Sequence, residues 1–161
     1  MTQFVINALL WFCAIGCGMM AGLYFAFSTF IMTALGQIPQ AHGISAMQSI
    51  NVVIQKSLFM PLFFGTTLAA LLLAGLALFR VNEPAAMAML AAGILYVVGM
   101  FVSTIVFNVP LNNALDAVEP SSTDAATVWT RYLKDWTFWN HLRTIASAAA
   151  SALFVAALVA G

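Results

Sequence analysis

Residues 4–35 read FVINALLWFCAIGCGMMAGLYFAFSTFIMTAL and contain no Lys, Arg, Asp or Glu. A helix rises about 1.5 Å per residue, so about 20 apolar residues cross the hydrocarbon core of a bilayer. The stretch is long enough to span a membrane and to tilt or protrude beyond it. We therefore predict a membrane-spanning helix over residues 4–35.

Three further apolar stretches meet the same length criterion, at residues 58–79, 85–107 and 137–160. Arg80 ends the first of these, and the run NVP at residues 108–110 closes the second. A membrane β-barrel needs short strands of alternating polarity, whereas these runs are continuous and rich in Leu and Ala. The sequence predicts an all-α integral membrane four-helix bundle that forms one domain over residues 1–161.

The composition supports the same fold class. Hydrophobic residues make up 63% of the chain and charged residues 6%, with a formal net charge of zero. Soluble domains average about a quarter charged residues, so this chain cannot build an ordinary water-facing surface. Nucleic-acid binding needs a basic face to neutralise phosphates, which five Lys and Arg cannot supply. We expect membrane lipid as a partner and no nucleic acid.

The three links between the predicted spans differ in length. Residues 80–84 form a short turn, whereas the first and third links cover residues 36–57 and 108–136. Apolar side chains at helical spacing in the first link, and Ser121 followed by Asp124 in the third, predict an interfacial helix in each. Four spans place both long links on one side, which also collects His42, Gln48, Asn51 and Lys56. The balance of Lys and Arg favours the cytoplasm for that side.

The fourth span carries a polar stripe inside an apolar helix. At 100° per residue, one narrow arc holds Asn140, Thr144, Ser147 and Ser151, flanked by Arg143 and His141. An arginine inside a span costs about 2.5–3.5 kcal/mol on insertion scales, so it usually faces the protein interior and marks a site. The alternative is that Arg143 extends to lipid phosphates at the membrane surface.

Aromatic residues lead into the same span at helical spacing: Trp129, Tyr132, Trp136 and Trp139. Such a stripe is typical of an interfacial aromatic belt. The alternative is a platform for a flat ligand.

The first span carries a second stripe, formed by Cys13, Cys17, Tyr24 and Ser28. Beside it lies a run of small residues that includes Gly18 and Gly22, which favours close helix packing and is compatible with a homo-oligomer. Cys13 and Cys17 with Met20 could bind Cu(I), but a free Cys is also an ordinary buried residue.

Metal ligands and cofactor motifs are scarce in this sequence. A zinc or iron site needs three or four converging ligands, and the only imidazoles are His42 and His141. No dinucleotide fingerprint or phosphate-binding glycine loop is present. We therefore expect no metal site, no flavin and no bound nucleotide.

Two motifs carry a family resemblance. Asn-x-Pro-x-Asn lies in NVPLNNAL at residues 108–115, and Trp-x-x-x-Asn-x-x-Arg lies in WTFWNHLRT at residues 136–144. With AGLYFAFSTFIM at 21–32 and HGISAMQSIN at 42–51, the chain resembles the anthrone oxygenase-like family of small four-span membrane proteins. The resemblance implies oxidation of tricyclic anthrones by O₂ to anthraquinones, without flavin or an established metal. Its bacterial members imply a cytoplasmic membrane location.

These motifs suggest a site for that chemistry. We expect His141 to take a proton from the substrate, because a neutral imidazole is available near neutral pH. We expect Arg143 to stabilise the resulting enolate, helped by amides. The expected further site residues are the amides Asn108, Asn112 and Asn140, the stacking rings Trp136 and Trp139, and Tyr24 and Ser28 on the first span. Two alternatives are a lipid- or quinone-type binding protein and a structural membrane subunit without catalysis. An exporter is disfavoured, because the two halves show no internal repeat.

Overall fold

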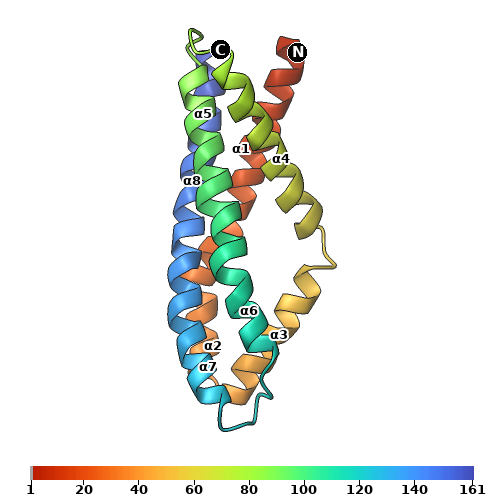
Figure 1. The fold of residues 1–161 in the computed structure, drawn as a ribbon, viewed down its shortest axis with the longest axis vertical. Helices are drawn as coiled ribbons and strands as arrows, with labels where there is room; N and C mark the ends of the chain where they lie inside the picture. The colour runs from red at the N-terminus through yellow and green to blue at the C-terminus, as the bar shows by residue number, and fades with distance from the viewer. Residues whose placement is uncertain (1) are drawn as a thin grey trace.

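The computed structural model describes residues 2–161 and arranges them as one elongated helical bundle (Figure 1). Four continuous helical segments in this described part of the chain are long and apolar enough to cross a membrane. They cover Gln3–Gln37, Phe59–Leu78, Ala86–Asp116 and Ala125–Ala160. The predicted all-α four-span architecture is confirmed, and the chain is built as a multi-pass membrane protein.

The four spans and their first link divide into α-helices and shorter π-helical stretches. In chain order these are α1 (Gln3–Ala26), η1 (Phe27–Ile31), α2 (Met32–Gln37), α3 (Gln40–Ile54), α4 (Phe59–Leu78), α5 (Ala86–Ile94), η2 (Leu95–Val102), η3 (Thr104–Asn108), α6 (Val109–Asp116), α7 (Ala125–Arg131), η4 (Tyr132–Trp136) and α8 (Thr137–Ala160). The η stretches are π-helical and each continues the backbone of its span.

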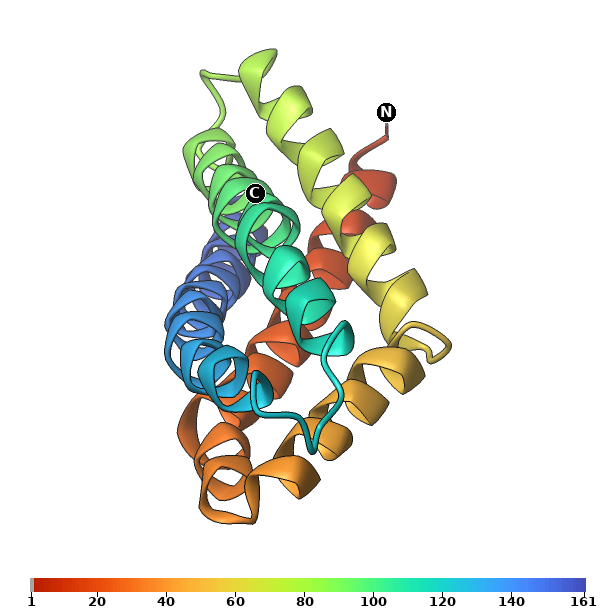
Figure 2. The same cartoon turned by 60° about the horizontal axis from the view of Figure 1, so that its bottom comes forward.

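The two ends of the bundle differ as the link lengths predict. Both chain ends and the short α4–α5 turn lie at one end, and the α2–α3 and α6–α7 connections lie at the other (Figure 1). When that second end is turned forward, α3 is seen crossing it obliquely before the chain enters α4 (Figure 2). The bundle therefore has one short turn between helices at one end and an extra helix across the other.

Small residues bring the helices close together near the short turn. A Cβ atom on Gly93 of α5 would lie 2.6 Å from the Cβ of Ala74 and 2.8 Å from the carbonyl oxygen of Ala70, both on α4. Lipid tails are as apolar as the helices, so close backbone contact is a main source of helix association in a bilayer. Glycine at position 93 is what permits this contact between α4 and α5.

The third span is longer than predicted. Residues 108–110 do not end it, and the helix continues through Pro110 to Asp116. Pro110 lies in the first turn of α6, directly after the π-helical stretch η3, where a missing backbone donor is tolerated. The extension carries Asn112 along the same helix, toward the end of the bundle that α3 crosses.

The links contain helices, as expected, but in different ways. α3 is a separate helix whose Gln48 Nε2 donates hydrogen bonds of 2.9 and 3.0 Å to the carbonyl oxygens of Leu115 and Val118 at the end of α6. α7 instead continues without a break through η4 into α8. The hydrogen bonds of Gln48 fix α3 against the end of the third span.

Candidate functional site

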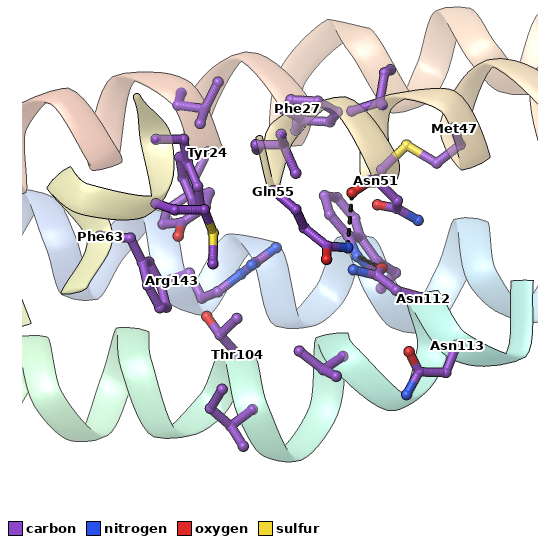
Figure 3. A pocket seen from close by; sticks show the side chains of 18 of the residues that line it. Tyr24, Phe27, Met47, Asn51, Gln55, Phe63, Thr104, Asn112, Asn113 and Arg143 are labelled. Carbon is purple, nitrogen blue, oxygen red and sulfur yellow. Dashed lines mark hydrogen bonds between the residues drawn. The ribbon is translucent and has the colours of Figure 1, made fainter. Parts of the chain in front are cut away.

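A cavity of about 320 Å³ lies where α3 meets the four spans, in the half of the bundle that holds the long links. This volume is at the lower end of the range for small-molecule sites. Figure 3 shows its lining, in which Phe27, Met47 and Phe63 are among the apolar side chains. The polar lining residues are Tyr24, Asn51, Gln55, Thr104, Asn112, Asn113 and Arg143. The site is thus an apolar chamber with a few polar groups.

Arg143 is the charged residue of this chamber. It lies two turns into α8, and its side chain is 4% exposed. Its guanidinium carbon lies 4.4 Å from the ring centroid of Tyr24 and 5.0 Å from that of Trp136, so it is held between two aromatic faces. Within residues 2–161, no carboxylate pairs with it, and its Nε donates to no acceptor. The positive charge is therefore not neutralised by any carboxylate in the described part of the chain.

Asn140 orients Arg143. Its Oδ1 accepts a hydrogen bond of 2.7 Å from Arg143 Nη2. Its Nδ2 donates at 2.7 Å to the carbonyl oxygen of Tyr24 and at 2.7 Å to Ser28 Oγ. Because the Tyr24 carbonyl can only accept, the amide has one possible orientation, with its oxygen toward the arginine. Thr144 Oγ1 completes the cluster, 3.1 Å from Ser28 Oγ.

The Asn-x-Pro-x-Asn motif at residues 108–112 makes hydrogen bonds to Trp136, which is the first residue of the Trp-x-x-x-Asn-x-x-Arg motif. Asn108 Nδ2 donates to the backbone carbonyl of Trp136 at 3.2 Å. Asn112 Oδ1 accepts from Trp136 Nε1 at 2.8 Å and from the hydroxyl of Tyr132 at 2.8 Å. The indole is thereby fixed beside the guanidinium of Arg143. The two motifs are one structural unit that positions an arginine.

Three of the four π-helical stretches occur at the level of this cavity. η1, η3 and η4 contribute Phe27, Thr104 and Trp136 to its lining. π-Helical turns inside α-helices are frequent at functional sites. Their clustering here is a further sign that the chamber is a site rather than a packing defect.

The structure brings together most of the residues predicted from the sequence. Tyr24, Asn112, Trp136 and Arg143 line the cavity, and behind them Ser28, Asn108 and Asn140 form the hydrogen bonds described above.

Two predicted residues lie elsewhere. Trp139 stacks on Phe107, with ring centroids 3.5 Å apart, and does not line the chamber. His141 is exposed, on a face of α8 that points away from the buried Arg143, and does not line it either.

Sequence reasoning missed several lining residues, among them Phe27, Met47, Phe63 and Thr104. It placed Asn51 among the polar residues on this side of the membrane, and as an alternative to Ile50 in the helically spaced stripe of the first link, but not among the site residues. The signal for Asn51 lay in the pattern of α3, whose buried face consists of Gly43, Ile44, Met47 and Asn51. A polar residue that continues an apolar stripe is a candidate site residue.

The lining is also defined by the groups it does not contain. Among the described residues that line the cavity there is no carboxylate and no imidazole. Cys13 and Cys17 are free, buried thiols on α1, and residues 2–161 contain no group of three His, Cys, Asp or Glu side chains placed to hold a metal ion. Arg143 is the one charged residue among the described residues of the lining.

Comparison with known proteins gives one match. The sequence profile described as anthrone oxygenase matches residues 51–153, a range that contains both motifs and Arg143. No curated protein and no solved structure matches the chain. The profile covers well over half of the sequence and includes the lining residues of the cavity from Asn51 to Arg143, so the chain belongs to the anthrone oxygenase family.

Proposed function

We propose that the protein is a membrane-embedded oxygenase that uses O₂ to oxidise a flat, apolar aromatic substrate of the anthrone type. The observation that carries the proposal is the buried guanidinium of Arg143, which faces an apolar chamber without a carboxylate partner. Family membership supports the same chemistry.

Arg143 suits the charge that this reaction develops. Loss of a proton from the ring methylene of an anthrone gives an enolate, whose negative charge lies largely on the former carbonyl oxygen. A fixed cation in a poorly hydrated chamber stabilises that oxygen more strongly than water does. Asn140 holds the guanidinium in place before substrate binds, so little reorganisation accompanies the reaction.

Oxygen then reacts at the carbon that lost the proton. A carbon–oxygen bond forms between the enolate carbon and O₂, giving a peroxide that takes up a proton. The remaining hydrogen on that carbon then leaves as a proton, the O–O bond breaks and water departs. One anthrone and one O₂ thus give one anthraquinone and one water, and two electron pairs pass from the substrate to oxygen.

The proton acceptor in this proposal is water at the cavity mouth. The lining contains no carboxylate or imidazole among its described residues, and His141 lies outside it. Gln55 and Asn113 are exposed and line the chamber, so water reaches it on their side. By favouring the enolate, Arg143 makes deprotonation by a weak base sufficient.

The aromatic walls suit a flat polycyclic ligand. Phe27, Phe63 and Trp136 face the chamber from three different helical segments. A second, almost wholly apolar pocket on the outside of α1 and α4 shares Leu23 and Phe59 with the chamber. An apolar substrate dissolved in the lipid can reach the site along this surface without crossing water.

The test is oxygen uptake by purified protein in detergent with unsubstituted anthrone, corrected for the spontaneous rate. Arg143→Met retains the length of the side chain and removes its charge, and we expect it to lower the enzymatic rate about 100-fold. Arg131→Met is the matched control, because Arg131 is exposed and pairs with Asp135 outside the cavity. We expect this control and His141→Ala to retain the parent rate.

The outcomes separate the alternatives. A parent protein that binds anthraquinone but gives no uptake above background is a binding protein rather than an oxygenase. If Arg143→Met folds and turns over anthrone at the parent rate, Arg143 does not have the proposed role. If His141→Ala loses activity whereas Arg131→Met retains it, the base is His141 and not water.

A further inference from the structure

The chamber contains a second polar group for a ligand, at a different place from Arg143. Asn51 projects from α3, whereas Arg143 projects from α8 (Figure 3). Asn51 is 4% exposed, and its Nδ2 is buried without a hydrogen-bond partner in the part of the chain that the structure describes. A buried amide donor left unpaired costs about 1–3 kcal/mol, so its presence calls for an explanation.

The surroundings of Asn51 do not satisfy this donor. Its polar neighbour is Tyr132, whose hydroxyl interacts with the Asn51 side chain and donates its own hydrogen bond to Asn112 Oδ1. No hydrogen bond of ordinary geometry joins that hydroxyl to Asn51 Nδ2. The neighbouring residues on the buried face of α3 are Ile44 and Met47, which pack into the apolar cluster at this end of the bundle. The hydrogen bonds that anchor α3 to α6 come from Gln48. The amide group of Asn51 is therefore not needed to hold its helix in place.

The neighbouring amides of the lining differ from Asn51, because Asn112 is only half-buried and Gln55 is exposed. Asn112 Oδ1 accepts two hydrogen bonds from Trp136 and Tyr132, and Gln55 Nε2 donates to the backbone carbonyl of Asn51 at 3.0 Å. The Nδ2 of Asn51 is thus the buried amide donor of the lining that is left free for a ligand.

We infer that Asn51 is a specificity-determining residue that donates a hydrogen bond to a second oxygen of the ligand, on the part of the ring system remote from the oxygen held by Arg143. The inference rests on the proposed function for the orientation of the ligand, but it predicts binding as well as turnover. The ligand is then a flat aromatic with two oxygen substituents at separate positions. One of them carries the developing negative charge and the other accepts a neutral hydrogen bond.

The experiment compares two inert ligands that differ by one such oxygen. They are fluorenone, a flat tricyclic with one carbonyl oxygen, and a fluorenone with one hydroxyl on an outer ring, and their binding to detergent-solubilised protein is measured by equilibrium dialysis. We expect the parent to bind the hydroxylated ligand about 5- to 10-fold more tightly, the usual effect of one neutral hydrogen bond. Asn51→Leu should abolish this preference and leave the affinity for unsubstituted fluorenone within about twofold.

Two further variants make the result specific. Asn51→Asp keeps the shape of the side chain but replaces the donor by an acceptor, so the preference should be lost as in Asn51→Leu. Asn82→Leu alters an exposed amide in the α4–α5 turn, outside this lining, and should keep the preference.

The inference is overturned if the parent binds both ligands equally, or if Asn51→Leu weakens both to the same extent. Turnover plays no part in these measurements. If the binding preference disappears in Asn51→Leu, the role of Asn51 stands even when no oxygen uptake is found. If uptake is found but the parent shows no binding preference, the proposed function stands and the role of Asn51 does not.

Discussion

Arg143 Nη2 donates a hydrogen bond of 2.7 Å to Asn140 Oδ1, one turn earlier on α8. The partner is a neutral amide rather than a carboxylate, so the guanidinium is oriented without being neutralised. A carboxylate at this position would bind more strongly to Arg143 but would compete with an anionic ligand.

The first prediction concerns that relationship. Asn140→Asp should lower oxygen uptake with anthrone about tenfold or more, because the new carboxylate pairs with Arg143 and removes its charge from the cavity. It also places negative oxygens against the carbonyl oxygen of Tyr24, so the thermal stability should fall. Asn140→Ala removes the hydrogen bond that orients Arg143 but adds no negative charge, so its activity should fall less than that of Asn140→Asp. Equal activity of Asn140→Asp and the parent would contradict this reading.

The second prediction concerns Asn112. Asn112→Leu leaves the hydroxyl of Tyr132 and the indole N–H of Trp136 without their shared acceptor. Each buried donor left unpaired costs about 1–3 kcal/mol of unfolding free energy. Thermal unfolding in detergent, followed by circular dichroism, should show a clear loss relative to Asn113→Leu, whose side chain is exposed.

The third prediction separates two tryptophans. Trp136 lines the cavity, whereas Trp139 stacks on Phe107 outside it. Trp136→Leu should weaken the binding of anthraquinone about 3- to 10-fold, in keeping with the energy of one aromatic contact. Trp139→Leu should leave that binding unchanged in equilibrium dialysis. The reverse order would place the ligand against the outer pair instead.

The fourth prediction tests helix packing near the short turn. Gly93→Ala forces a methyl group against the backbone of α4 and should destabilise the protein by about 1–3 kcal/mol. At Gly75 on α4, an added Cβ meets nothing within 4 Å. Gly75→Ala should therefore leave the unfolding temperature unchanged or slightly raised, and similar losses in both variants would show that the effect is not one of close contact.

Much of the fold follows from local properties of the sequence. The four spans are evident because each contains enough consecutive apolar residues to cross a bilayer, and the link lengths fix which ends lie together. Arg143 and Asn140 could be assigned to a buried face because both lie near one stripe of a helix that is otherwise apolar. These inferences need only the 100° spacing of side chains on a helix.

The rest depends on how separate helices meet. The sequence around Phe63 and around Thr104 does not distinguish these residues from others in a span. They become lining residues only because α4 and η3 face each other across the cavity. The sequence predicts His141 as the base from its neutral imidazole at the edge of the polar stripe, yet two residues along a helix is a rotation of about 200°. That rotation takes its side chain to the far side of α8 from Arg143.

The end of the third span shows a different limit. Pro110 predicts a helix end when only α-helical geometry is considered, but a π-helical stretch immediately before it allows the helix to continue. Hydropathy and periodicity carry no signal for such a stretch, since the residues of η3 are ordinary apolar ones apart from Thr104 and Asn108.

The π-helical stretch η4 sets the phase of everything that follows it on α8. A π turn holds one residue more than an α turn, so it acts as a built-in single-residue insertion. Deleting one residue within 132–136 and restoring regular α geometry would rotate the downstream helix by about 100° relative to the upstream one. The arginine that now enters the chamber would then face a neighbouring helix or the lipid. The position of one charge seven residues away is thus encoded in the winding of the backbone as well as in the side chains that touch it.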